Sequence, residues 1–367
     1  MSQRGSSSRW AGAGYRSSTA LALVSGIDDT TEELEVIEEP EEPKDDPQLP
    51  PPPPPSVVDQ WKVAAPNLDA DGRRELPGRR RRALRAVTFG AYKGLESKEE
   101  WRHRRAEARA LAPLPADVGV GTVVVAQPKG GVGKSATAVL AACALGQFTR
   151  LSPILWDCNE NAGGRWQLRT EDTLFLRTAL HLLTEPRRGT VLSQVEATAI
   201  DQDTQAYQVI ASPIPPRPFT DGEFGTIYSK LAQRFTQIVI DTGSTVTSPN
   251  FENAIRRADV VVVPTDLAPS TQSSTLALFE ALEDQWGKDW ARKVVAVVTN
   301  PVPDPDLEWE KFLSEKVTEV VKVPYDEHIA ARGPITWSGM SEGTHESCLH
   351  LAGAITDIYR QNTNQGN

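Results

Sequence analysis

The chain has 367 residues and carries 39 Lys and Arg against 49 Asp and Glu, a formal net charge of -10. Its three cysteines are odd in number and none has a C-x-x-C partner, which argues against a disulfide framework and a thiolate metal site. No stretch reaches the ~18 apolar residues of a membrane span, and the first residues lack the apolar core of a secretion signal. We therefore expect a cytoplasmic protein with no stable membrane insertion.

Residues 1–71 predict a disordered, acidic and proline-rich tail. Residues 28–46 hold eleven acidic residues and one lysine, and residues 50–55 are six consecutive prolines. Such segments bury too little apolar area to offset the entropy of ordering, and the prolines favour a short polyproline II rod. The rod is either a solvated spacer or a docking site for a partner with an aromatic groove.

Residues 72–115 reverse the sign of the charge and predict a basic linker. Segment 73–85 contains seven arginines and one glutamate. Clustered arginines suit phosphate contacts, so this segment either binds nucleic acid or an anionic surface, or pairs with the acidic tail. A second basic stretch, residues 101–109, predicts a short helix. Three residues would lie near one face of that helix: Trp101, Ala108 and Leu111.

Residues 116–367 predict one folded α/β domain. Continuous Val and Ile runs indicate strands buried on both faces, and their alternation with amphipathic stretches indicates a mainly parallel, twisted sheet flanked by helices. Ligands bind such sheets at the carboxyl ends of the strands. The predicted strands are 122–126, 153–156, 208–211, 237–240, 260–263, 294–298 and 317–323, and the predicted helices include 135–148, 224–235 and 271–286.

Residues 123–135 carry the strongest chemical signal, because an apolar strand runs through a glycine-rich turn into a helix. Three glycines let the backbone wrap around phosphate with its amides inward, and the helix N-terminus adds positive potential. Lys134 would supply a point charge for the terminal phosphates, and the Ser135 hydroxyl is the expected magnesium ligand. The expected nucleotide-binding residues of the loop are Gly130, Gly131, Val132, Gly133, Lys134, Ser135 and Ala136.

The sequence KGGVGKS at residues 129–135 resembles the deviant Walker A motif of the ParA/MinD superfamily, the partition and cell-positioning ATPases. The usual Walker pattern has glycine where this chain has Pro128, which that family tolerates. The resemblance implies a P-loop fold that binds ATP with Mg²⁺. It also implies a homodimer with ATP, in which Lys129 reaches across the interface to the partner's phosphates, as an arginine finger does.

Two further strand ends fit the same family. Residues 154–159 occupy the place of the family's first switch. The resemblance implies that Asp157 holds a water bound to magnesium. Asn159 stands where the family usually has an aspartate that orients the attacking water. An amide orients water but accepts no proton, so slow hydrolysis is expected. Residues 235–243 resemble Walker B with the second switch, and Asp241 would lie beside the magnesium shell, with Gly243 as a pivot. Together with Lys129 and Lys134, these side chains form the expected catalytic set.

The base side of the site is expected on the late strands. In the family an asparagine at the position of Asn300 contacts adenine, and the loop at Pro324 and Asp326 matches the family's loop near the base. The motif at residues 156–160, followed by residues 163–166, is similar to tailed ParA-like proteins of high-GC Gram-positive bacteria. Some of these proteins serve plasmid or chromosome partition, and others accompany type VII secretion systems.

Two functions remain open on these grounds. The first is a partition ATPase whose ATP-bound dimer binds DNA without sequence preference, which would associate it with the nucleoid, and releases it when a ParB-like partner triggers hydrolysis. The second is a regulatory or assembly ATPase of a type VII secretion or similar apparatus, with slow hydrolysis. Residues 116–367 hold 21 basic and 30 acidic residues, a net charge of -9. Any DNA contact is therefore expected at the arginine segment 73–85.

Overall fold

The computed structural model describes most of the chain beyond residue 95. The described residues are Arg73 and the ranges 96–114, 118–160, 169–170, 177–184, 189–202, 206–299 and 306–364. All of them fall within one compact unit, Pro66–Asn367. The acidic and proline-rich tail lies outside the described residues, as does the arginine segment 73–85 apart from Arg73.

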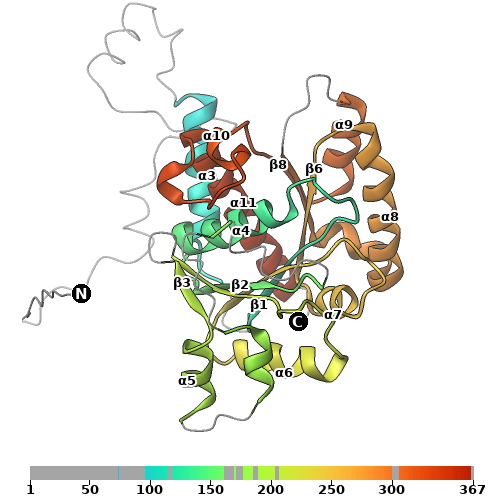
Figure 1. The fold of residues 1–367 in the computed structure, drawn as a ribbon. Coiled ribbons are helices and arrows are strands. Elements are labelled where there is room, and N and C mark those ends of the chain that lie inside the picture. The colour runs from blue at the N-terminus through green and yellow to red at the C-terminus, as the bar shows by residue number, and fades with distance from the viewer. Residues whose placement is uncertain are drawn as a thin grey trace, which may run out of the picture. The chain divides into compact units, whose positions relative to one another are not determined.

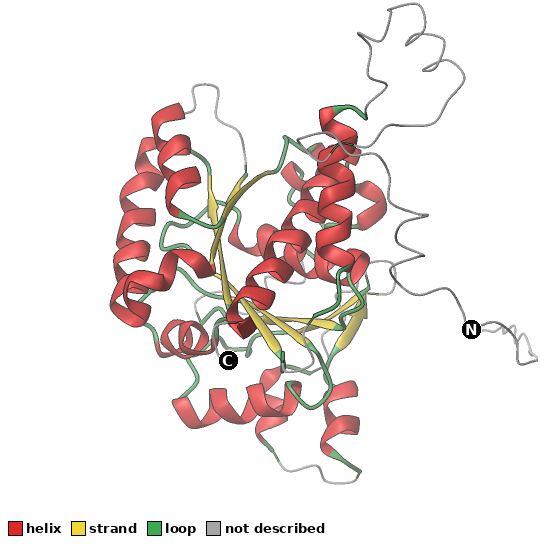
Figure 2. Cartoon of the chain, turned by 180° about the vertical axis from the view of Figure 1, so that it is seen from behind, coloured by secondary structure: helices red, strands yellow, loops and turns green. Residues whose placement is uncertain are grey.

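An eight-stranded sheet runs through this unit (Figures 1 and 2). Its order is β3-β4-β2-β5-β1-β6-β7-β8, and every neighbouring pair is parallel except the antiparallel pair β3 and β4. The predicted mainly parallel sheet is therefore confirmed. The strands are β1 (Gly121–Val125), β2 (Pro153–Asp157), β3 (Ile200–Gln202), β4 (Tyr207–Ile210), β5 (Gln237–Asp241), β6 (Val260–Thr265), β7 (Val294–Val298) and β8 (Glu319–Lys322).

Helices cover both faces of the sheet (Figure 2). On β1, Val123 and Val125 join the core under α3, α4 and α11, whereas Val124 joins the opposite core under α6, α7, α8 and α9. This alternation is the period of two that a strand imposes on its side chains. The helices are α3 (Lys98–Leu111), α4 (Lys134–Phe148), α5 (Val191–Glu196), α6 (Asp221–Leu231), α7 (Pro249–Arg257), α8 (Pro269–Trp286), α9 (Leu307–Lys316), α10 (Glu327–Ala330) and α11 (Glu342–Asn364). Short 3₁₀ helices span Ala179–Leu183, Gly287–Lys293 and Trp337–Gly339.

Burial explains why the sequence predicted the central strands. Strands β1, β2, β5, β6 and β7 are buried at every position, so each reads as an uninterrupted apolar run. The edge strand β8 is shorter than predicted, because only Glu319–Lys322 pairs with β7, and Val317 instead ends α9. Among the described helices, none combines the length and apolar character that crossing a bilayer requires.

Helix α3 is part of the folded unit and differs from its prediction. A Ser97 capping box starts it, and its buried residues are Ala106 and Ala110, whereas Leu111 is 51% exposed. The buried face of α3 is therefore formed by these two alanines, and Leu111, which the sequence placed near one face with Trp101 and Ala108, is not part of it. Helix α3 packs closely on α11, where a Cβ at Gly353 would lie 3.4 Å from the Ala106 carbonyl oxygen. So close a contact accepts alanines and leaves the larger leucine outside.

Two arginines of α3 are engaged inside the fold. Arg109 Nε donates to Asp357 on α11 at 2.5 Å, and its Nη2 donates to Glu319 on β8 at 2.5 Å. Arg104 pairs with the buried Glu96 at 2.5 Å. These side chains therefore join α3 to the sheet and to the chain before it, and their charge is compensated within the molecule.

Candidate nucleotide site

The loop between β1 and α4 has the backbone of a phosphate-binding nest. Gly131 and Gly133 adopt φ values of 85° and 89°, a left-handed conformation that residues with a Cβ disfavour. Gly133 is the N-cap of α4, and no side chain caps this helix. The first amides of α4 therefore lack partners within the helix, and they form the positive end of its dipole. The geometry suits an anion.

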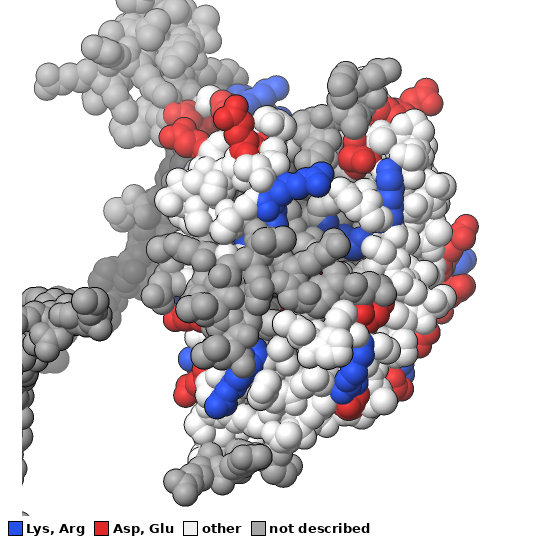
Figure 3. All heavy atoms as spheres, viewed as in Figure 1, with Lys and Arg blue, Asp and Glu red and all other residues white. Residues whose placement is uncertain are grey.

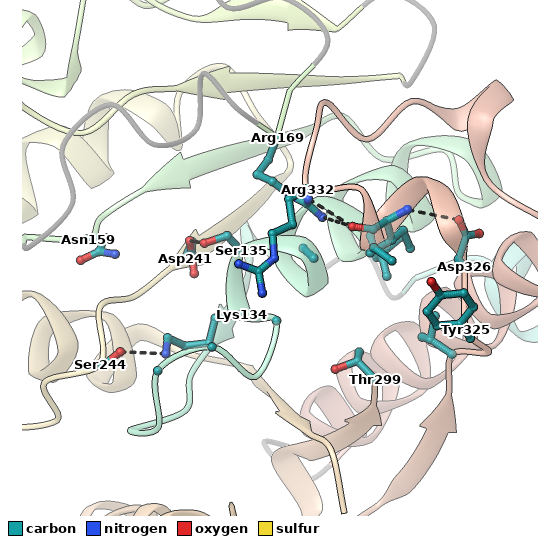
Figure 4. Close-up of a pocket in the computed structure, with 18 of the residues that line it drawn as sticks. Lys134, Ser135, Asn159, Arg169, Asp241, Ser244, Thr299, Tyr325, Asp326 and Arg332 are labelled. Atoms are coloured by element: carbon teal, nitrogen blue, oxygen red, sulfur yellow. Dashed lines mark hydrogen bonds between the residues drawn. The ribbon is translucent and has the colours of Figure 1, made fainter. Parts of the chain in front are cut away.

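Lys134, the first residue of α4, lies beside this loop (Figure 4). Its Nζ donates to the Lys129 carbonyl and to Ser244 Oγ, both at 2.9 Å. Burial lowers the pKa of the amine, and the nearby Asp241 carboxylate opposes that shift. Both acceptors are neutral, so a phosphate oxygen would be a stronger partner for this cation than either of them.

Two carboxylates meet where β2 and β5 end. Asp157 and Asp241 are register partners and both are buried. Ser135 Oγ donates to Asp241 Oδ2 at 2.7 Å. Burial, followed by repulsion from Asp157, raises the pKa of Asp241 to about 8, although Ser135 and Lys134 oppose the rise. Without a bound cation, negative charge on both carboxylates at once is therefore unfavourable in this site.

These groups fit a magnesium ion. Asp241 Oδ1 is buried and accepts no hydrogen bond within the described part of the chain, so it is an oxygen ligand without a partner. Hydroxyl and carboxylate oxygens are the ligands that Mg²⁺ prefers, and this ion is usually held by one or two carboxylates together with phosphates and water. A cation here would also relieve the repulsion between Asp157 and Asp241. Ser135 Oγ stands within hydrogen-bond distance of the same site.

Asn159 contacts the segment that follows β5. Its backbone amide donates to Asp157 Oδ1 at 3.2 Å. A Cβ placed on Gly243 would lie 3.1 Å from Asn159 Oδ1 and 3.0 Å from Glu160 Oε1. The two segments predicted as switches are therefore packed closely together at a glycine, and a displacement of one would require the other to adjust.

Lys129 points away from Lys134 and toward α8. Its Nζ donates to Ser270 Oγ at 2.6 Å and to Thr271 Oγ1 at 2.8 Å, and lies 3.9 Å from Asp266 Oδ2. The side chain is 27% exposed and is not among the described residues that line the cavity. In the single chain this lysine contacts its own α8, so its predicted role across a dimer interface stays a prediction.

The end of β7 is joined to the loop. Thr299 Oγ1 donates to the Val132 carbonyl at 3.1 Å. Val132 itself is buried and contributes its backbone to the loop rather than a cavity-lining side chain. Asn300, predicted to contact adenine, lies outside the described residues. Pro324 and the 64% exposed Tyr325 line the cavity on this side.

Asp326 lies at the cavity wall, but its carboxylate serves the fold. Oδ1 accepts hydrogen bonds from the amides of His328 and Ile329 at 3.0 and 3.2 Å, which caps α10. Oδ2 accepts from the Ser341 amide at 2.8 Å and from Thr344 Oγ1 at 2.7 Å. Burial raises the pKa of Asp326, but the hydrogen bonds from Thr344, Ser341 and Ile329 together outweigh it, so the pKa is lowered overall. Its predicted contact with the nucleotide stays a prediction.

The loop, the carboxylates and the late loop enclose one cavity of about 830 Å³, a size typical of small-molecule sites. The predicted residues that it brings together are Gly130, Gly131, Gly133, Lys134, Ser135, Ala136, Asp157, Asn159, Asp241, Pro324 and Asp326. Sequence reasoning assigned no role to five polar residues of the lining: Arg169, Ser244, Thr299, Tyr325 and Arg332. The position of Ser244, three residues after Asp241, was a usable signal. The two arginines follow no motif.

The likeness of the chain to known proteins is a likeness to solved structures. No protein-family model matches it, and no curated protein matches it. Solved structures with a similar fold include the cell division ATPase MinD of Pyrococcus furiosus, with a TM-score of 0.49 and 14% identity over 65% of this chain and 99% of that one. A ParA family ATPase of Chlorobium tepidum has a TM-score of 0.47 and 15% identity over 66% of this chain and 98% of its own.

A third structure is MinD of Pyrococcus horikoshii complexed with Mg-ADP, with a TM-score of 0.47 and 12% identity over 63% of this chain and 94% of that one. At identities and TM-scores this low, the three structures are similar to the chain in fold alone, with its mainly parallel sheet and helices on both faces.

Proposed function

We propose that this chain is a P-loop ATPase that binds ATP with Mg²⁺ and dimerises when ATP is bound. The observation that carries the proposal is the convergence, in one cavity, of the loop amides, the Lys134 amine and the Ser135–Asp241 pair. Amides and an amine bind phosphate, and the hydroxyl and carboxylate oxygens bind a hard cation. Magnesium, when bound, would neutralise charge on the phosphate oxygens.

The proposal gives each side chain a role. The loop from Gly130 to Ala136 holds the phosphates. Within it, Lys134 contributes its amine to them, and Ser135 holds the metal directly. Asp157 and Asp241 act on the metal through water, which is consistent with their burial beneath the loop. Asn159 orients the attacking water but accepts no proton from it, so turnover is slow. Asn300, Pro324 and Asp326 form the base side.

Calorimetry of the full chain with Mg-ATP tests this function. We expect saturable binding that weakens when EDTA removes magnesium, because the cation offsets repulsion between phosphates and the buried carboxylates. A folded sample that takes up no nucleotide at millimolar ATP and magnesium contradicts the proposal.

We further propose that the ATP-bound dimer positions DNA in chromosome or plasmid partition, with a ParB-like partner that triggers hydrolysis. The seven arginines of segment 73–85 support a DNA contact. On the face shown in Figure 3, basic and acidic side chains of the described residues are interspersed rather than gathered by sign. The contact is therefore assigned to the arginine segment, and the nucleoid is the expected location.

DNA binding measured at two salt concentrations tests the partition role. With ATP present, counterion release predicts a steep loss of affinity between 50 and 200 mM salt, on the order of 10³-fold if six phosphates are contacted. A variant with glutamine at Arg79, Arg80, Arg81 and Arg82 should lose most of that slope. Absence of DNA binding at low salt with ATP removes the partition role and leaves the ATPase proposal intact.

The second candidate is a regulatory or assembly ATPase of a type VII secretion or similar apparatus. Asn159 favours it, because its side-chain amide lies at the switch contact with Gly243 where an aspartate would speed hydrolysis. Comparing ATPase rates with DNA and with a candidate apparatus protein separates the two functions. Stimulation by DNA with a partition partner supports the first, and stimulation by the apparatus protein alone supports the second.

A further inference from the structure

Two arginines face the phosphate loop across the cavity. Arg169 and Arg332 both line it, and Figure 4 shows Arg332 pointing into the space between Ser135 and Tyr325. We call residues 130–136 the P-loop wall, and Arg169 with residues 329–332 the arginine wall. Neither arginine belongs to the loop or switch motifs of the sequence, so the arginine wall is a second source of positive charge in the cavity.

The two segments of the arginine wall are hydrogen-bonded to each other. The Ile329 carbonyl accepts from Arg169 Nη1 and Nη2 at 3.3 and 3.4 Å, and from the Arg332 amide at 3.2 Å. In return, the Ile335 amide donates to the Arg169 carbonyl at 2.9 Å. The arginine wall is therefore one connected unit, in which the Arg169 guanidinium is bonded to the turn that carries Arg332.

Within the described ranges, no ion pair joins Arg169 or Arg332 to a carboxylate, in contrast to Arg104 and Arg109, which each pair with acidic side chains. Burial, followed by repulsion from Arg332, lowers the pKa of Arg169. Two like charges held close together without an acidic partner are costly unless an anion binds between them and their surroundings.

The backbone of Arg332 supports a functional reading. Its φ is 59°, in the left-handed region that non-glycine residues seldom adopt. Strain of this kind concentrates at ligand-binding positions. A glycine would take the same conformation freely, so an arginine occupies this position at an energetic cost.

The position of the wall selects which part of a nucleotide it would meet. The terminal phosphate belongs near Lys134, Asp241 and Asn159, at the far side of the loop. The backbone of Arg332 instead follows α10, on the side of the cavity assigned to the base, and its side chain extends toward Ser135 and Lys134 (Figure 4). A guanidinium between these two ends would lie beside the phosphates that ADP and ATP have in common.

From these observations we infer that Arg332, positioned with Arg169, is a nucleotide-binding residue that contacts the α- and β-phosphates from the wall opposite the P-loop. The inference rests on the proposed nucleotide-binding function and deepens it. Arg332 contacts the ligand directly. Arg169 adds charge and, through the Ile329 carbonyl, fixes the turn that carries Arg332. The phosphates would then be held between two cationic walls, as bidentate arginine contacts allow.

Arg332→Gly gives a sharp test, because it removes the guanidinium and suits the local φ. Calorimetry of the full chain with Mg-ATP and with Mg-ADP should show affinity reduced by the same factor for both, on the order of 10- to 100-fold for a lost charge-assisted contact. The thermal midpoint should not fall. Arg150→Gln, at an exposed arginine just after α4, should bind both nucleotides like the unmodified chain.

The outcomes separate this inference from the proposed function. Unchanged affinity in Arg332→Gly overturns it, and so does a loss confined to ATP, which would place the guanidinium at the terminal phosphate. Arg332→Asn, which also tolerates the left-handed conformation, repeats the test if the glycine variant folds poorly. If the unmodified chain binds no nucleotide, the proposed function itself fails. If only Lys134→Ala loses binding, the function stands and the arginine contact falls.

Discussion

The P-loop wall and the arginine wall face the same cavity but are built differently. The P-loop wall is one continuous segment, in which left-handed glycines and the uncapped start of α4 turn backbone amides into an anion site. The arginine wall combines residues 160 positions apart, joined through the Ile329 carbonyl, and its charge resides on side chains. Backbone amides fix the place of an anion at little entropic cost, whereas flexible guanidiniums need a wall that holds them.

The two walls should therefore contribute differently to the affinity for Mg-ATP. Lys134 and the loop amides act together with the Ser135–Asp241 pair, so the P-loop wall combines phosphate and metal contacts. The arginine wall adds contacts to the phosphates alone. We therefore expect the largest losses of function from changes to the P-loop wall, and intermediate ones from the arginine wall.

Lys134→Ala should cause the largest loss. It removes the buried amine that would meet the terminal phosphates and leaves the Asp157–Asp241 repulsion less compensated. We expect Mg-ATP affinity, measured by calorimetry, to fall by roughly 100-fold or more. Lys311→Ala, at an exposed lysine of α9, is the control and should bind normally. A Lys134→Ala protein within threefold of the unmodified affinity would show that the amine is not a phosphate ligand.

Lys129→Ala separates nucleotide binding from dimerisation at the residue next to the P-loop wall. Since Lys129 contacts Ser270 and Thr271 of its own chain and not the cavity, its loss should change Mg-ATP affinity by less than about threefold. ATP-dependent dimerisation, followed by sedimentation, should weaken on the order of tenfold or more if the lysine meets the partner's phosphates. Normal dimerisation of this variant with ATP refutes the role across the interface.

The different construction of the walls also explains what the sequence could predict. The P-loop wall and the central strands could be predicted from the sequence, because glycine spacing and unbroken apolar runs are local signals. Strands β5 and β7 were placed within one residue of their observed bounds. The site residues of the loop follow from the glycine spacing, whereas those at the ends of β2 and β5 were assigned through the family resemblance.

What the sequence did not reveal depends on contacts between distant residues. The arginine wall has no local motif, because Arg169 and Arg332 meet only through tertiary structure. The buried face of α3 could not be predicted for a related reason, since the close approach at Gly353 on α11 decides which side is covered. Asp326 was assigned to the nucleotide from its position, whereas its four hydrogen bonds show a capping role as well.

Asn159→Asp should have a smaller, opposite effect, because it adds a proton acceptor of the same size beside Gly243. We expect steady-state ATP turnover to rise, roughly tenfold, with Mg-ATP affinity little changed. Phosphate release under saturating Mg-ATP measures this. The matched Asn159→Ala variant should be slower than the unmodified chain. An unchanged or lower rate in Asn159→Asp would show that the amide does not limit hydrolysis.

The smallest expected effect concerns the contact that holds Lys129 on its own α8. Ser270 is exposed and accepts the shortest hydrogen bond of the lysine, 2.6 Å from Nζ. If Lys129 must leave α8 to reach a partner's phosphates, this bond opposes dimerisation. Ser270→Ala should then strengthen ATP-dependent dimerisation by a few-fold, the weight of one hydrogen bond to a charged group at an exposed site.

Sedimentation with ATP measures this effect, and Ser273→Ala, in the same helix but outside the Lys129 contacts, is the control. The gain should vanish in the Lys129→Ala background, because no lysine remains to be released. A gain that persists there would mean that Ser270 acts on the interface by itself. Weaker dimerisation in Ser270→Ala would instead mean that α8 orients the lysine toward the partner, so that the bond belongs to the dimer and not to the single chain.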